Sequence, residues 1–212
     1  MPSFGMVKDV SESCERADKG ATLTPGELLA IASVLRTSRS LMDYCHGNHL
    51  FDTVLDEIFD RLLPNRTLEE KITRSIISEE LIADEASDTL ANIRRQIRIT
   101  NNKIKETLQK YIQGGAHSKY LQENIVTTRN GRYVIPVKAE CKNEVKGLIH
   151  DTSSSGATIF VEPSAVVDAN NELRMLESKE AHEIERILSE FSSDIATASP
   201  SLNLNYRNIT EL

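Results

Sequence analysis

Tryptophan is absent from this 212-residue sequence, and all aromatic residues together make up only 5% of it. Hydrophobic residues make up 39%, which is little for a compact enzyme built around a deep pocket. The three cysteines, Cys14, Cys45 and Cys141, are too few and too scattered for a disulfide framework. These shortages favour an elongated helical protein in a reducing compartment.

Long apolar runs are also missing, and none approaches the length of a membrane span. The first residues mix polar and charged side chains from Lys8 onward, unlike a secretory signal. We therefore expect a soluble, cytoplasmic protein that does not contact a membrane.

Catalytic signatures are absent as well. The sequence has no G-x-x-x-x-G-K-[ST] phosphate loop, no G-x-S-x-G and no H-E-x-x-H. Three metal ligands are conceivable at Cys45, His46 and His49, but a closed zinc site needs four, so a polar helix end is favoured. His150 beside Asp151 could form an acid–base pair. A pair that caps a turn at the end of a strand is the favoured interpretation. The chain itself is thus expected to be no enzyme and to hold neither metal nor cofactor.

Helix signals dominate the first part of the chain. Thr24 with Glu27 forms a capping box before an apolar stripe, and Pro25 suits the first helical position. Thr67 with Glu70 offers a second capping box. The predicted helices cover residues 25–47, 50–63 and 67–76, and a turn or small hairpin is predicted within 78–87.

Two longer helices are predicted at 87–113 and 164–198, each with a narrow apolar seam near the coiled-coil interval. Because they flank one β-rich insert, they should pair antiparallel and carry it like a lever with a tip. The predicted fold class is mainly α with a small β insert. The predicted organisation is a helical core at 1–86, lever helices at 87–123 and 164–212, and a β-rich insert at 124–163.

The insert contains four predicted strands. They cover residues 125–128, 132–139, 145–150 and 158–161. Asn130-Gly131 predicts a tight hairpin turn between the first two strands. Pro136 in mid-strand requires an edge or a bulge, since proline donates no ladder hydrogen bond.

Charge is unevenly distributed along the chain. The formal net charge is −7, yet residues 92–146 hold 12 Lys and Arg against 4 Asp and Glu, leaving −15 for the remainder. Such a polarised chain should turn its middle segment towards a polyanion. The alternative is a solvated surface without a partner. The candidate contacts are Arg129, Arg132, Lys138, Lys142 and Lys146. Arg132 and Lys138 share a strand face, and Lys142 and Lys146 would share it if the strand continued.

A run of small hydroxyl residues supplies a weaker candidate. Ser153, Ser154, Ser155 and Gly156 could present backbone and side-chain donors to a phosphate oxygen. A polar hairpin loop in which the glycine has a positive φ is favoured over that function.

Four ordered motifs resemble the second bacterial branch of the MutS family, here termed MutS-two. They are Arg132-Tyr-Val-Ile-Pro-Val-Lys138, Gly147-Leu-Ile-His-Asp151, Ser155-Gly-Ala-Thr-Ile-Phe-Val-Glu-Pro163 and Asn170-Asn-Glu-Leu-Arg174. The likeness runs from about Gly20 to the last residue and is strongest over 124–190.

The resemblance implies the core, lever and clamp region of an ATPase that embraces nucleic acid as a homodimer. In that family the ATPase domain, with ATP and Mg, follows this region, and a small nuclease domain often closes the chain. The family is linked to suppression of recombination and to splitting of collided ribosomes. No position here matches the ATPase or nuclease sites, so the resemblance implies a fragment in which only Arg132, Lys138, Lys142 and Lys146, and less strongly 153–156, carry over as contacts.

The expected function is therefore non-catalytic binding of branched or duplex DNA, or of structured RNA such as the ribosome, through phosphates. The rival is a structural dimerisation or protein-interaction module, whose binding would persist at high salt.

Overall fold

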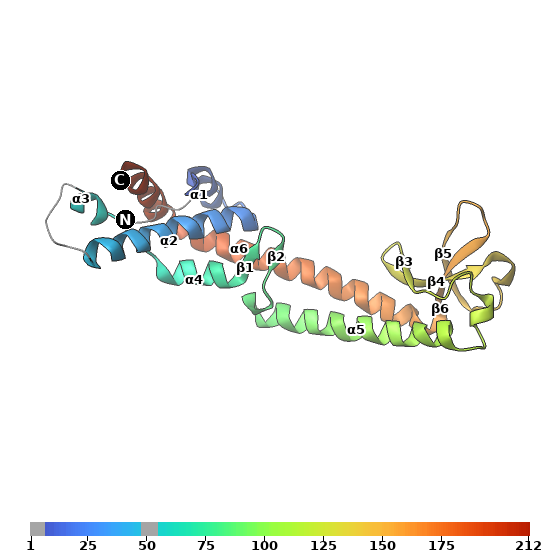
Figure 1. The fold of residues 1–212 in the computed structure, drawn as a ribbon. Helices are drawn as coiled ribbons and strands as arrows, with labels where there is room; N and C mark the ends of the chain where they lie inside the picture. The colour runs from blue at the N-terminus through green and yellow to red at the C-terminus, as the bar shows by residue number, and fades with distance from the viewer. Residues whose placement is uncertain (1–6, 48–54) are drawn as a thin grey trace. The chain divides into compact units, whose positions relative to one another are not determined.

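The computed structural model describes residues 7–47 and 55–212, and the chain is mainly α-helical with a small sheet portion (Figure 1). The predicted fold class is confirmed at this level. Contacts divide the chain into two units. Unit 1 comprises residues 1–91 and 182–212, and unit 2 comprises residues 92–181.

Unit 1 is a helical assembly with one short hairpin. Its elements are α1 (Ser11–Asp18), α2 (Pro25–Gly47), α3 (Asp56–Phe59), α4 (Arg66–Ser75), β1 (Ile76–Ser78), β2 (Leu81–Ile82), the 3-10 turn Asp84–Ala86, the start of α5 (Asp88–Gln113) and the later part of α6 (Val167–Glu211). The hairpin predicted here is confirmed, although it begins slightly earlier. Helices α2, α4 and α6 supply much of the core, including Leu28, Ile31, Leu35, Ile72 and Ile195.

The start of α2 follows the predicted capping box. The Glu27 backbone N–H donates to Thr24 Oγ1 at 3.3 Å, and the Thr24 N–H donates to Glu27 Oε2 at 2.9 Å. Pro25 is the first helical residue, where its missing N–H costs nothing. Two of the donors left unpaired at a helix start are thereby satisfied.

Helix α4 begins earlier than predicted, because Asn65 and not Thr67 is its N-cap. The Leu68 N–H donates to Asn65 Oδ1 at 3.0 Å, so the asparagine serves the third helical residue. Asparagine is at least as good a cap as threonine. Thr67 therefore lies inside the first turn, and the second predicted capping box is wrong.

The helix predicted over 50–63 falls partly on residues 50–54, which lie outside the described residues. In the part that follows, only α3 is helical, and it ends at Phe59. Beyond it, Asn205 on α6 accepts from the Leu63 N–H at 2.7 Å and donates to the Leu63 carbonyl at 2.9 Å, so a distant side chain holds the backbone of the residue where the predicted helix would end.

Helix α6 is longer than predicted at its C-terminal end, since it continues past residue 198 to Glu211. Residues 164–166 form a 3-10 turn before it. Pro200 lies inside the helix, where proline ordinarily interrupts a helix. The buried stripe nevertheless resumes after it with Leu202 and Ile209, so tertiary packing outweighs the local preference.

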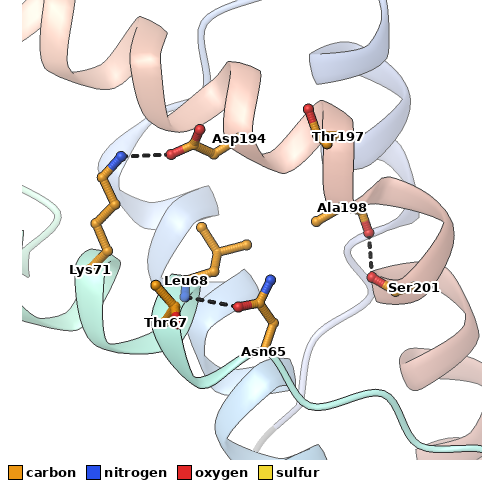
Figure 2. A pocket seen from close by; sticks show the side chains of 8 residues that line it. All are labelled: Asn65, Thr67, Leu68, Lys71, Asp194, Thr197, Ala198 and Ser201. Atoms are coloured by element: carbon orange, nitrogen blue, oxygen red, sulfur yellow. Dashed lines mark hydrogen bonds and ion pairs between the residues drawn. The ribbon is translucent and has the colours of Figure 1, made fainter.

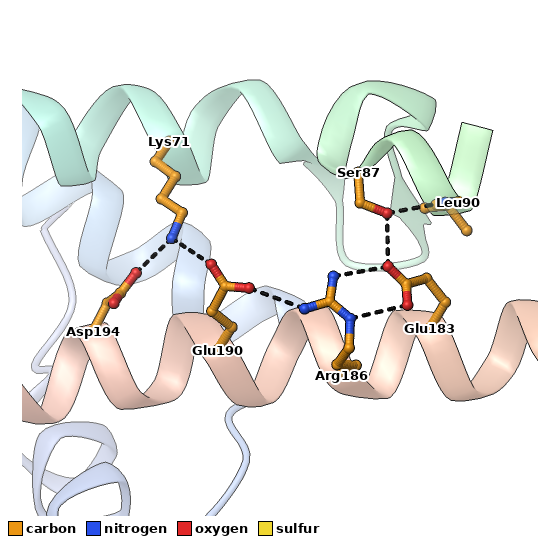
Figure 3. A network of polar contacts seen from close by, with 7 residues as sticks. All are labelled: Lys71, Ser87, Leu90, Glu183, Arg186, Glu190 and Asp194. Carbon is orange, nitrogen blue, oxygen red and sulfur yellow. Dashed lines mark hydrogen bonds and ion pairs between the residues drawn. The ribbon is translucent and has the colours of Figure 1, made fainter. Parts of the chain in front are cut away.

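A chain of ion pairs ties α6 to α4 and to the start of α5 within unit 1 (Figure 3). Lys71 Nζ on α4 is 2.9 Å from Glu190 Oε1. Arg186 bridges Glu190 and Glu183 at 3.1 and 2.8 Å. Ser87, whose Oγ accepts from the α5 backbone, donates to Glu183 at 2.7 Å. Hydrogen bonding from Arg186 holds the pKa of the Glu183 carboxyl below its usual range.

Unit 2 contains residues 92–113 of α5 and 167–181 of α6, which run antiparallel. Arg94 Nε on α5 lies 2.6 Å from Glu180 Oε1 on α6. Further along α5, Ile104 and Leu108 share a buried cluster with Leu173 of α6. A seam of apolar side chains, closed at one end by an ion pair, holds the two segments together.

The sheet of unit 2 is antiparallel, in the order β3-β4-β6-β5. Its strands are β3 (Thr127–Arg129), β4 (Arg132–Lys138), β5 (Gly147–Thr152) and β6 (Thr158–Pro163). All four predicted strands are confirmed, with ends shifted by about two residues. Ile135, Val137, Ile159 and Val161 join the buried cluster formed with α5 and α6.

Of two local predictions for this hairpin, the turn is confirmed. Asn130 and Gly131 both have positive φ, 52° and 72°, as a tight hairpin turn between β3 and β4 requires. Pro136 pairs with Phe160 of β6, while β3 has already ended on its other side. On that side Leu121 forms an isolated antiparallel bridge with Val137, and the Gln122 N–H donates to the Pro136 carbonyl at 2.9 Å. The β4–β6 register is regular at Pro136, so the predicted edge or bulge is wrong. The proline fits because only its carbonyl is used on that side.

Candidate nucleic-acid interface

Charge separates between the two units. Unit 2 carries fourteen Lys and Arg against ten Asp and Glu, whereas unit 1 carries eleven against twenty-two. Their formal net charges are therefore +4 and −11. The excess of positive charge predicted for the middle of the chain thus belongs to the unit that contains the sheet.

Arg132 is committed to a buried ion pair. Its Nη1 donates to Glu162 Oε1 at 2.8 Å, and the Glu162 side chain is 0% exposed. Asn170 Nδ2 donates to the same oxygen at 2.8 Å, and His150 Nε2 contacts Oε2 at 2.5 Å. Burial alone would raise the pKa of Glu162, but hydrogen bonds from its three partners lower it below the usual range. This cluster fastens β4, β5 and β6 to α6.

His150 and Asp151 do not form a pair, so the acid–base alternative has no support in the geometry. His150 contacts Glu162, as described above, while Asp151 Oδ2 lies 3.2 Å from Arg129 Nε. The Arg129 guanidinium also stacks 3.9 Å above the centre of the Phe160 ring. Arg129 is therefore held on the sheet by a carboxylate and an aromatic face.

The three candidate lysines differ in whether their side chains already have a hydrogen-bond partner. Lys138 Nζ donates to the Lys119 carbonyl at 3.1 Å. Strand β4 ends at Lys138 and a 3-10 turn follows, so Lys142 and Lys146 do not share its strand face. Both are exposed, and within residues 7–47 and 55–212 neither side chain makes a hydrogen bond or ion pair.

The serine-rich loop between β5 and β6 mostly satisfies itself. Ser153 Oγ accepts from the Thr158 N–H at 3.0 Å and lies 3.3 Å from Ser155 Oγ. The Gly156 N–H donates to the Ser153 carbonyl at 2.8 Å, and Gly156 has φ 73°. Ser154 is exposed. These contacts match the hairpin-turn interpretation and leave few donors for a phosphate.

The conceivable metal ligands near the end of α2 do not gather. His46 Nδ1 bonds to the Met42 carbonyl at 2.9 Å, and Cys45 Sγ lies 3.8 Å from an oxygen of Asp56. His49 lies outside the described residues. Across the part of the chain that the structure describes, no three His, Cys, Asp or Glu side chains form a group that could hold a metal ion.

The outer face of α5 is a further candidate surface, which was not among the residues predicted from the sequence. Residues 92–113 hold six Lys and Arg against one acidic residue, Glu106. Lys103, Lys105 and Lys110 are exposed, and none makes an ion pair or hydrogen bond through its side chain within the described residues. The sequence does indicate this surface, because the basic residues of 92–113 avoid the positions of the apolar seam. The excess of positive charge was instead attributed to the strands of the insert.

A cavity of about 530 Å³ lies in unit 1 beside the start of α4 (Figure 2). Its polar lining is already paired. Asn65 accepts from the Leu68 N–H, Lys71 pairs with Asp194 at 2.7 Å, and Ser201 donates to the Ala198 carbonyl at 2.8 Å. Nothing in it therefore points to a ligand.

Within the described ranges, none of the helices combines the length and the apolar character that a membrane span requires.

No family model matches the sequence. Curated proteins named Endonuclease MutS2 do match it. The protein from Acetivibrio thermocellus is 48% identical over 207 residues, which cover 96% of this chain and 26% of the relative. Those from Ruminiclostridium cellulolyticum and Clostridium beijerinckii are 47% and 40% identical over 208 and 212 residues, covering 96% and 99% of the chain.

The chain spans about a quarter of the length of these relatives. The matches extend over both units and over the four motifs quoted above, since they cover nearly every residue. Over nearly all of its length the chain is therefore similar to one segment of the proteins named Endonuclease MutS2.

Proposed function

We propose that this chain is the lever and clamp segment of a MutS2-type protein of DNA repair and recombination, and that it binds nucleic acid through the phosphates. The observation that carries the proposal is the set of exposed, unpaired lysines on a positively charged unit within an acidic chain. Lysine provides point charges for phosphates and reads no sequence by that contact. The proposal concerns binding, and it assigns the endonuclease chemistry named for the relatives to no described residue.

Under this proposal the basic residues in and beside the sheet have two different roles. Lys142 and Lys146 bind phosphates, because their ammonium groups have no partner in the described residues. Arg129 and Arg132 keep the sheet in shape, since each is held by a carboxylate of the same unit. The 153–156 loop contributes less, because most of its donors are used within the turn.

Binding to a duplex DNA and to a structured RNA, measured by fluorescence anisotropy over a salt series, tests the proposal. The logarithm of the binding constant should fall with that of the salt concentration, by about 0.9 per phosphate neutralised on duplex DNA. Lys142→Glu with Lys146→Glu should abolish binding to both. A matched control reverses two exposed, unpaired cations of unit 1, Lys8→Glu with Arg207→Glu. Equal loss in both variants, or in neither, would overturn the proposal.

A second candidate function is protein interaction through β5, which lies at an edge of the sheet. Leu148 and Ile149 are 52% and 54% exposed there, an unusual pair on an uncovered strand. A second copy of the chain or another protein could add a strand to this edge. Self-association that persists in 1 M salt and is lost in Ile149→Lys would favour this function over phosphate binding.

A further inference from the structure

A groove of about 390 Å³ lies within unit 2, between α5 and the polypeptide that leads into β3. Lys105 and Gln109 line it from α5, residues 124–126 line it from the connecting segment, and Tyr133 lines it from β4. Its volume falls within the range of small-molecule sites. No role assigned above involves this groove.

The floor of the groove is apolar. Ile112, which is 8% exposed, and Val126 and Tyr133 border the buried cluster of unit 2. Ile125 is 47% exposed and also lines the groove. An aromatic ring between aliphatic side chains favours a flat, unsaturated ligand that loses little by leaving water.

The polar side chains of the groove have no partners among the residues that the structure describes. The side chains of Lys105, Gln109 and Asn124, and the Tyr133 hydroxyl, make no hydrogen bond or ion pair to any described residue. Two amides provide both donors and acceptors, while the ammonium provides only donors and a charge. Such a set suits a ligand with a hydrogen-bonding edge and an anionic group close by.

The charge around the groove selects an anion. Lys105 lies between Lys103 and Lys110 along α5, all three exposed and unpaired within the described residues, and Glu106 is the single carboxylate of residues 92–113. A phosphate at Lys105 would meet that ammonium alone, because Lys103 and Lys110 lie about 200° and 140° around the helix from it. An apolar peptide side chain would contact the apolar residues of the groove but would form no hydrogen bond with the two amides or the ammonium.

We propose that this groove receives the base of one unpaired nucleotide, with Lys105 at its phosphate and the Gln109 and Asn124 amides at the base edge. A paired base is excluded because stacking and pairing hide its face and edge. The inference rests on the proposed function for the class of ligand. It adds to that function a preference for single-stranded or unpaired regions.

Three labelled strands of equal length test it with the whole chain: a single strand of uridines, an abasic strand with the same phosphates, and a duplex. The single strand should bind more tightly than the abasic strand. Gln109→Ala with Asn124→Ala should weaken binding of the uridine strand about tenfold and leave binding of the abasic strand unchanged. The matched control, Gln96→Ala with Asn102→Ala, changes the same residue types at exposed positions of α5 outside the groove.

Equal affinity for the uridine and abasic strands, or an unchanged affinity in the groove variant, would overturn the inference while leaving phosphate binding intact. A titration with uridine monophosphate tests the groove independently of strand binding. The nucleotide should shift the side-chain amide signals of Gln109 and Asn124 in an NMR titration, and their failure to move overturns the inference. Shifts without any binding of the three strands would instead reject the proposed function and keep the groove as a nucleotide site.

Discussion

Arg132 and Glu162 form an ion pair whose carboxylate has no exposed surface, with 2.8 Å between Nη1 and Oε1. Arg132 lies on β4 and Glu162 on the adjacent β6, and Asn170 of α6 donates to the same carboxylate. A residue that resembled a ligand contact in the sequence is therefore part of what holds the sheet to α6. Removing Arg132 would leave the fully buried carboxylate without its guanidinium partner.

Arg132→Ala should lower the free energy of unfolding by about 3 kcal/mol, because the buried carboxylate would lose its guanidinium partner and keep only its contacts with His150 and Asn170. Urea unfolding followed by circular dichroism measures the loss. Arg129→Ala is the control, since its pair with Asp151 is partly exposed and should cost only about 1 kcal/mol. Equal losses in the two variants would contradict the structural role given to Arg132.

Acid should destabilise the chain partly through Glu162, whose pKa is lower than usual because hydrogen bonds from its partners outweigh the effect of burial. A carboxyl group whose pKa falls on folding stabilises the folded state above its unfolded pKa. That stabilisation is lost as the pH falls through the folded value, from about pH 5 downward. Glu162→Gln should therefore show a shallower loss of unfolding free energy between neutral and acidic pH.

The control for this pH series is Glu177→Gln, at an exposed residue of α6 whose side chain makes no hydrogen bond or ion pair within the described residues. Its stability should follow the parent chain at every pH. If Glu162→Gln retained the full acid dependence, Glu162 would not be a source of it.

The two possible caps of α4 should respond differently to mutation. Asn65→Ala should cost about 1 kcal/mol, because the Leu68 N–H loses its acceptor. Thr67→Ala should cost almost nothing, since alanine is the better helix former at an exposed helical position. Thermal unfolding of both variants measures the difference, and a larger effect at Thr67 would restore the cap predicted from the sequence.

Gly147 should not tolerate alanine. A Cβ atom there would lie 2.1 Å from the Glu162 carbonyl oxygen, so the β5–β6 pair would have to move apart. We expect a loss of about 1–3 kcal/mol in unfolding free energy. Gly115→Ala is the matched control, because a Cβ there meets nothing within 4 Å and φ is not positive. It should stay within about 0.5 kcal/mol of the parent chain.

Local signals predicted most of the elements. The Thr24–Glu27 box and the Asn130-Gly131 turn both depend on residues close in sequence, and both are confirmed. Strand periodicity likewise located the four strands of the insert to within about two residues.

The predictions that failed depended on distant partners. Asn205 binds both backbone groups of Leu63 from 142 residues away, and no local pattern announces that contact. Burial of Leu202 and Ile209 carries α6 through Pro200 against its intrinsic preference. For the candidate interface, the sequence indicated the charge of the segment but not which cations were already paired.

Unit 2 is continuous in sequence, whereas unit 1 joins residues near the start to residues 182–212. During synthesis the chain therefore emerges with the whole of unit 2 before the last turns of α6 that complete the core of unit 1. Until then, the apolar side chains of α2 and α4 that pack on α6 remain exposed to solvent. At that stage chaperones and proteases compete for the nascent polypeptide.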